Sequence, residues 1–87
     1  MLKYAKLDIE NGIQYLKVGF HNIIAAILTG ELPEFVVNIS LNYPFIVGIV
    51  KLTFPDADLA YAENMLELNF KEKVVKIIID DTKITFK

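Results

Sequence analysis

The sequence predicts an α+β fold in which two helices cover one face of an antiparallel sheet. Two observations support this: a central stretch, 35–54, has the pattern of two adjoining strands, and apolar residues over 12–29 recur at helical intervals. A third is the Val- and Ile-rich segment 73–87, which has the composition of strands. With 87 residues the chain has the length of one domain, and we expect residues 1–87 to form it.

The centre of the predicted sheet consists of two strands, 35–42 and 45–54. In the first, apolar and polar residues alternate, which is typical of a strand buried on one face only. The second is apolar on both faces up to Lys51, which indicates a strand inside the sheet with both faces covered. Pro44 lies between them and has no N–H to give to a ladder, so a turn is expected there.

The N-terminal third predicts a strand and then a helix. Residues 2–9 alternate between apolar and polar types, which favours a strand. The Asn-Gly pair at 11–12 could close a hairpin, but the helical spacing that follows favours a helix over 12–29, capped by this Asn and ended by Gly30. Gly19 inside the helix costs about 1 kcal/mol relative to Ala, which suggests close packing on a neighbour.

The segment 58–70 fits two structures. Its Ala, Leu, Met and Glu content and the spacing of its apolar residues favour a helix, whereas the alternative makes 65–70 a strand followed by a turn. The end of the chain is clearer: 73–79 predicts a strand, 80–83 a turn and 84–87 a short last strand.

Strand, helix, strand, strand, helix, strand is the order of a ferredoxin-like βαββαβ sandwich, here with a short C-terminal strand added. Both helices would cover one face of the sheet and leave the other face open. Hydrophobic residues make up 54% of the chain, more than a core of this size can cover, so we expect self-association through the open face. The candidate interface residues are Tyr4, Phe45, Val47, Ile49, Lys51 and Ile78.

Composition argues against several classes of function. The chain has no Cys, which rules out disulfides, Cys-ligated zinc and iron–sulfur clusters. Its net charge is −2 and all nine basic residues are Lys, so the arginine fork that recognises phosphate and guanine is absent, which disfavours nucleic-acid binding. Neither a secretory signal nor an apolar run long enough to span a bilayer is visible. We therefore expect a cytoplasmic chain without a membrane partner.

Few residues are candidates for catalysis or metal binding. His21, the only histidine, is expected on the polar side of its helix, and Ser40, the only serine, lies in the polar row of a predicted strand. Asp56 and Asp58 could bind Mg²⁺ or Ca²⁺, but capping of the following helix explains them as well. We expect no catalytic residue, no cofactor and no metal.

The leading hypothesis is a small non-catalytic binding or assembly module that acts as a homo-oligomer, most simply a homodimer, through the open face of its sheet. One alternative is a regulatory domain that binds a small ligand at a dimer seam. Another is an RNA-binding sheet, in which Tyr4 and Phe45 would supply the stacking aromatic rings. A third is an enzyme that uses Asp56, Asp58 or His21.

Overall fold

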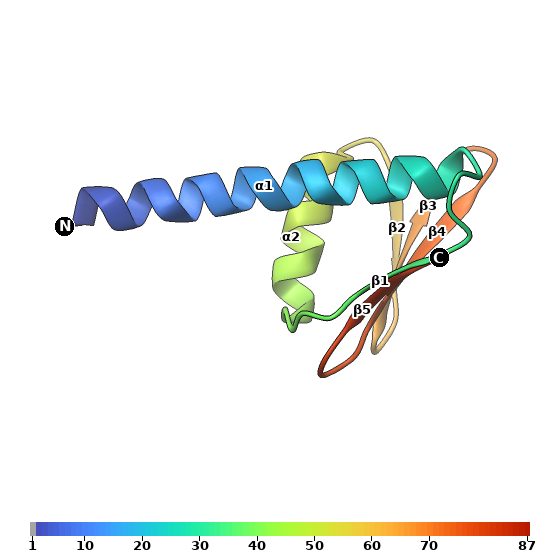
Figure 1. The fold of residues 1–87 in the computed structure, drawn as a ribbon. Coiled ribbons are helices and arrows are strands. Elements are labelled where there is room, and N and C mark those ends of the chain that lie inside the picture. The colour runs from blue at the N-terminus through green and yellow to red at the C-terminus, as the bar shows by residue number, and fades with distance from the viewer. Residues whose placement is uncertain (1) are drawn as a thin grey trace.

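The computed structural model describes residues 2–87, with the side chains of residues 9–87, as two helices and a five-stranded antiparallel sheet (Figure 1). The elements in chain order are α1 (Leu2–Leu28), β1 (Phe35–Val37), α2 (Tyr43–Thr53), β2 (Asp58–Tyr61), β3 (Met65–Asn69), β4 (Val74–Ile79) and β5 (Ile84–Phe86). The strand order is β1-β5-β4-β3-β2, so the last four strands form consecutive hairpins and β1 pairs with β5. Figure 1 shows α1 extending at its N-terminal end well beyond the other elements.

The sheet has one buried face because β3, β4 and β5 alternate between buried and solvent-facing side chains. The registers bring the buried side chains together across the strands: Leu66 is opposite Ile77, which is in turn opposite Phe86. The buried side chains are Leu66 and Leu68 on β3, Val75 and Ile77 on β4, and Ile84 and Phe86 on β5.

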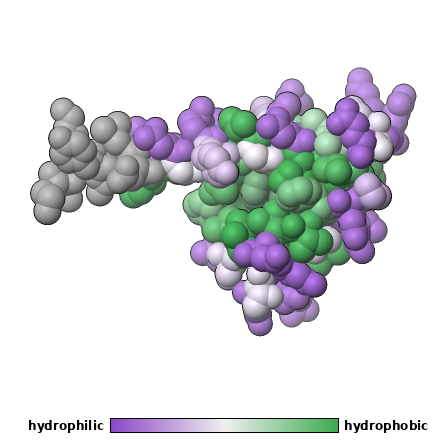
Figure 2. Space-filling model, viewed as in Figure 1, coloured by the Kyte–Doolittle hydropathy of each residue, from purple (hydrophilic) through white to green (hydrophobic). Residues whose placement is uncertain are grey.

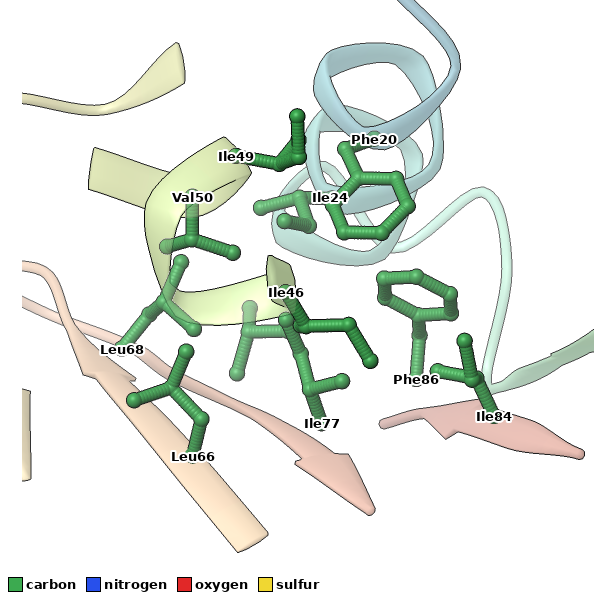
Figure 3. Close-up of a cluster of buried hydrophobic side chains, with 11 residues drawn as sticks. Phe20, Ile24, Ile46, Ile49, Val50, Leu66, Leu68, Ile77, Ile84 and Phe86 are labelled. Atoms are coloured by element: carbon green, nitrogen blue, oxygen red, sulfur yellow. The ribbon is translucent and has the colours of Figure 1, made fainter. Parts of the chain in front are cut away.

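Both helices pack their apolar sides on this buried face (Figure 3). From α1, Phe20 places its ring edge-on to that of Phe86, with the ring centroids 5.2 Å apart at an interplanar angle of 83°. Full burial of an aliphatic or aromatic side chain of this size contributes roughly 1.5–3 kcal/mol, so this layer is the main source of stability. The helix residues in the core are Phe20 and Ile24 on α1, and Ile46, Ile49 and Val50 on α2.

The strand predicted over 45–54 is wrong, because this segment belongs to α2. Asn42, the last residue of the strand predicted over 35–42, is the N-cap: its side-chain Oδ1 accepts a hydrogen bond from the backbone N–H of Phe45 at 2.9 Å. Pro44 stands in the first turn of the helix, where its missing N–H is not needed. The Tyr43 hydroxyl donates to the backbone carbonyl of Met65 at 3.0 Å and ties the start of α2 to β3.

The strand predicted over 2–9 is also wrong, since α1 already begins at Leu2. The helix predicted over 12–29 is confirmed as the C-terminal part of α1, and the Asn-Gly pair lies inside that helix instead of before it. Gly30 ends the helix as predicted: its φ is +82°, and the backbone N–H of Glu31 then bonds to the carbonyl of Ala26 at 2.9 Å.

The helix predicted over 58–70 is wrong, and the alternative that made 65–70 a strand is confirmed by β3. The intrinsic helix preference of Leu, Met and Glu is overridden here by pairing with β2 on one side and β4 on the other. The strands predicted over 73–79 and 84–87 are confirmed, and the turn between them is closed by a 2.9 Å bond from the Asp80 N–H to the Lys83 carbonyl. The strand predicted over 35–42 is shortened to Phe35–Val37.

The predicted α+β class, with two helices and an antiparallel sheet, is therefore confirmed. The ferredoxin-like order is not confirmed, because the described chain begins with a helix and its strands follow the order β1-β5-β4-β3-β2.

The one-sided burial of β4 can be tested at two neighbouring positions. Ile77 is fully buried, so Ile77→Ala should lower the free energy of unfolding by about 2–5 kcal/mol through lost burial and the cavity left behind. Val74, 43% exposed on the opposite side of the same strand, is the matched control, and Val74→Ala should change this free energy by less than about 1 kcal/mol. Urea denaturation followed by circular dichroism measures both, and equal losses would contradict the arrangement.

Substitution by alanine should change the stability of the protein in opposite directions at two of its glycines. A Cβ added at Gly48, inside α2, would meet no atom within 4 Å, so Gly48→Ala should stabilise the protein by about 0.5–1 kcal/mol through helix propensity. Gly30→Ala should destabilise it, because a φ of +82° is strained for any residue with a Cβ. Thermal denaturation of both variants at one protein concentration gives the comparison; shifts of the same sign would be inconsistent with these backbone conformations.

Candidate functional site

An apolar groove of about 510 Å³ lies between α1 and the β1–β5 edge of the sheet. One wall is formed by α1, including Leu16, Gly19 and Ile23, and the facing wall includes Phe35 on β1 and Ile39 just after it. No charged side chain lines the groove, and its apolar side chains come from three elements that are distant in sequence. The groove can therefore receive an apolar group without burying an unpaired charge.

The groove exists because α1 and the short edge strand β1 leave the space beside Gly19 unfilled. Next to this space α1 packs closely: Phe20 and Ile24 are in the core, and the wall residues Leu16 and Ile23 are partly buried against it. A Cβ added at Gly19 would meet nothing within 4 Å, so no part of the described chain makes the close contact that a glycine in this helix predicted. The close neighbour expected for Gly19 is missing within the chain.

Large apolar side chains are uncovered along the groove and on the adjoining part of α1. Tyr15 is 79% exposed, Val18 57%, Phe35 39% and Ile39 38%, and further toward the N-terminus Ile9 is 64% exposed. Figure 2 shows apolar residues gathered in a patch beneath α1, over α2 and the adjoining strands. Contiguous uncovered apolar surface is typical of a site of interaction.

The six residues predicted to form an interface do not come together on one face of the sheet. Four of them are on α2, where the helical turn points them in different directions, and Ile49 is buried in the core. Ile78 does lie on the solvent-facing side of β4, and Tyr4 belongs to α1, with a side chain outside the described part of the structure. The four residues on α2 are Phe45, Val47, Ile49 and Lys51.

The solvent-facing side of the sheet is less apolar than predicted. Met65 and Ile78 are cross-strand partners there, but the next pair along the same strands is Glu67 with Lys76. The rings that an RNA-binding sheet would use, Tyr4 and Phe45, belong to helices and not to its central strands. This face offers one apolar row beside charged residues, in contrast to the uncharged groove.

The polar candidates are dispersed. His21 is exposed and stacks on Phe54, with ring centroids 5.5 Å apart and an interplanar angle of 4°. Asp56 and Asp58 line an open hollow of about 620 Å³ at the end of α2, where Lys71 also lies. Within the part of the chain that the structure describes, no group of three or more His, Cys, Asp or Glu side chains is placed to hold a metal ion. The arrangement brings together apolar surface, not reactive groups.

Sequence reasoning missed the α1 wall of the groove, although a signal for it is present. Ile9, Gly12, Leu16, Gly19 and Ile23 follow one another at alternating intervals of three and four residues, which is the spacing of a helix–helix seam. The predicted boundary between a strand and a helix near the Asn-Gly pair divided this pattern in two. The seam becomes evident once α1 is known to be continuous across that point.

Comparison with known proteins gives no significant match, whether to a protein-family model, to a curated protein or to a solved structure. Over residues 2–87, no helix has both the length and the apolar character needed to cross a membrane. The function is therefore inferred from the surface described above.

Proposed function

We propose that the protein is a small non-catalytic assembly module that acts as a homo-oligomer, most simply a dimer, with the groove between α1 and β1 as its contact surface. The observation that carries the proposal is the uncharged apolar groove, with Tyr15, Val18 and Ile39 uncovered around it. This location replaces the solvent-facing side of the sheet as the expected interface, because charged residues interrupt the apolar row on that side.

The uncovered area is large enough to matter for association. Taking about 200 Å² for a whole aromatic side chain, Tyr15 and Phe35 leave about 240 Å² exposed. At about 100 Å² for an aliphatic side chain, Ile9, Val18 and Ile39 add about 160 Å². These five side chains thus provide about 400 Å², half of the roughly 800 Å² that each partner buries in a standard interface.

Oligomeric state tests the proposal directly. In sedimentation velocity at about 50–100 µM, the wild-type chain should have about twice the 9.9 kDa mass of one chain. Ile39→Lys, at the groove, should give monomers because association would bury an unpaired ammonium group. Val74→Lys is the matched control, since Val74 is 43% exposed on the solvent-facing side of β4, away from the groove, and this variant should remain dimeric.

A monomeric wild-type chain at these concentrations would rule the proposal out. Loss of the dimer in both lysine variants alike would show that association does not depend on the groove.

A second candidate function is the binding of a small apolar ligand, because the groove volume of about 510 Å³ lies within the range of roughly 300–1,000 Å³ typical of ligand sites. A medium-chain fatty acid is a suitable probe, and at about 100 times its Kd a bound ligand would stabilise the fold by about 2.7 kcal/mol. Thermal denaturation should then shift upward in the wild type and not in Gly19→Leu, whose added side chain would fill the groove. An equal shift in both proteins, or none, would remove this candidate.

A further inference from the structure

We propose that the second copy docks antiparallel along α1, so that Ile9 of each chain enters the groove of the other against the partner's Gly19. This inference rests on the proposed function and specifies its partner and geometry. Three properties of α1 support it: the spacing of its apolar residues, the open space at its glycines, and the match between large and small residues in one register.

The seam of α1 has a heptad pattern with an unusual division of sizes. Ile9, Leu16 and Ile23 are large and recur every seven residues, and Gly12 and Gly19 recur between them. The sequence continues the same spacing with Leu2 and Ala5 before this stretch and with Ala26 after it. The positions from Ile9 to Ala26 lie within α1, so large and small residues alternate along one side of this helix.

Neither glycine of the seam is accounted for by packing within the chain. A glycine inside a helix costs about 1 kcal/mol relative to alanine. A Cβ built on Gly12 or Gly19 would meet nothing within 4 Å, so neither position needs a glycine to make room for another part of the described chain. A helix from a second copy that lies along this seam would use the space that both glycines leave open.

Size complementarity selects an antiparallel pair. With a two-fold axis at Gln14, Ile9 faces the partner's Gly19 and Gly12 faces the partner's Leu16, so each large residue meets a small one. In a parallel pair, Ile9 would meet the partner's Ile9 and Gly12 the partner's Gly12. Overpacked layers of two large residues would then alternate with empty layers of two glycines, and both overpacking and cavities destabilise a close-packed interface.

The groove lies where this register needs it. Gly19 is on the α1 wall of the groove, opposite Phe35 and Ile39, so the partner's Ile9 would be received between the helix and the sheet edge. The α1 helix of 27 residues is about 40 Å long, and its N-terminal end projects beyond the other elements, which leaves it free to reach a second molecule (Figure 1). The two-fold axis makes the contact twice and covers the exposed side chains at both grooves.

An exchange of large and small residues tests the register. Gly19→Ile should raise the dimer Kd at least about tenfold by obstructing the partner's Ile9, and Ile9→Ala should raise it similarly by leaving the groove empty. The double variant Ile9→Ala/Gly19→Ile should return to within about threefold of wild type, because a large residue again faces a small one with the sides exchanged. Gly48→Ile, the same substitution on α2 outside the groove, is the control and should leave the Kd unchanged.

Spin-label distances test the orientation with little disturbance of the fold. Gln14, Glu10 and Thr29 are exposed, and each can be replaced by a cysteine that carries a nitroxide. With a rise of about 1.5 Å per residue, the two labels of a dimer should be offset along the helix axis by about 0 Å at position 14, 12 Å at position 10 and 45 Å at position 29. Distances from double electron–electron resonance should therefore increase in that order. A parallel pair would give three similar distances.

The possible results separate this inference from the proposed function. A wild-type protein that stays monomeric would overturn both. A dimer in which the double variant binds no better than the single variants, or in which the three distances are similar, would overturn the antiparallel register while homo-oligomeric assembly stands.

Discussion

The contact between the two helices and one face of the sheet holds the structure together. The buried side chains of the described chain all belong to that sheet face or to the helix surfaces packed on it, and none of them is polar or charged. Because α1 contacts β4 and β5 but leaves β1 at the edge, the helix cannot fill the space beside Gly19. The groove is therefore a consequence of how the core is covered, and its apolar walls are an extension of that core.

The elements with a clear composition or hydrophobic period could be predicted from the sequence. Residues 73–79 are rich in the β-branched Val and Ile typical of a strand, and the apolar residues of α1 from Ile13 onward recur every three or four positions. The segment 45–54 could not be assigned in this way, because apolar residues surround α2 almost completely and give no period. Its start signal was present in Asn42 and Pro44, but both residue types are also typical of turns.

The candidate site was less predictable than the fold, since it depends on contacts between distant segments. The predicted interface required Phe45 and Ile49 to lie on a strand, and it lost its geometry once α2 formed. The groove depends on the pairing of Phe35 with Phe86, and no local pattern in the sequence announces a partner about fifty residues away. Local preference also failed at 65–70, where pairing with neighbouring strands outweighs helix propensity.

The strand order has a consequence for the order of folding. The strands β2 to β5 are joined by short hairpins, so their contacts close small loops and can form early. The pairing of β1 with β5 closes a loop of about fifty residues and gains only three residue pairs, so we expect it to form late and to open first. Since β1 is one wall of the groove, a nascent or partly opened chain lacks the complete groove. The assembly proposed above would thus be limited to chains that have completed their fold.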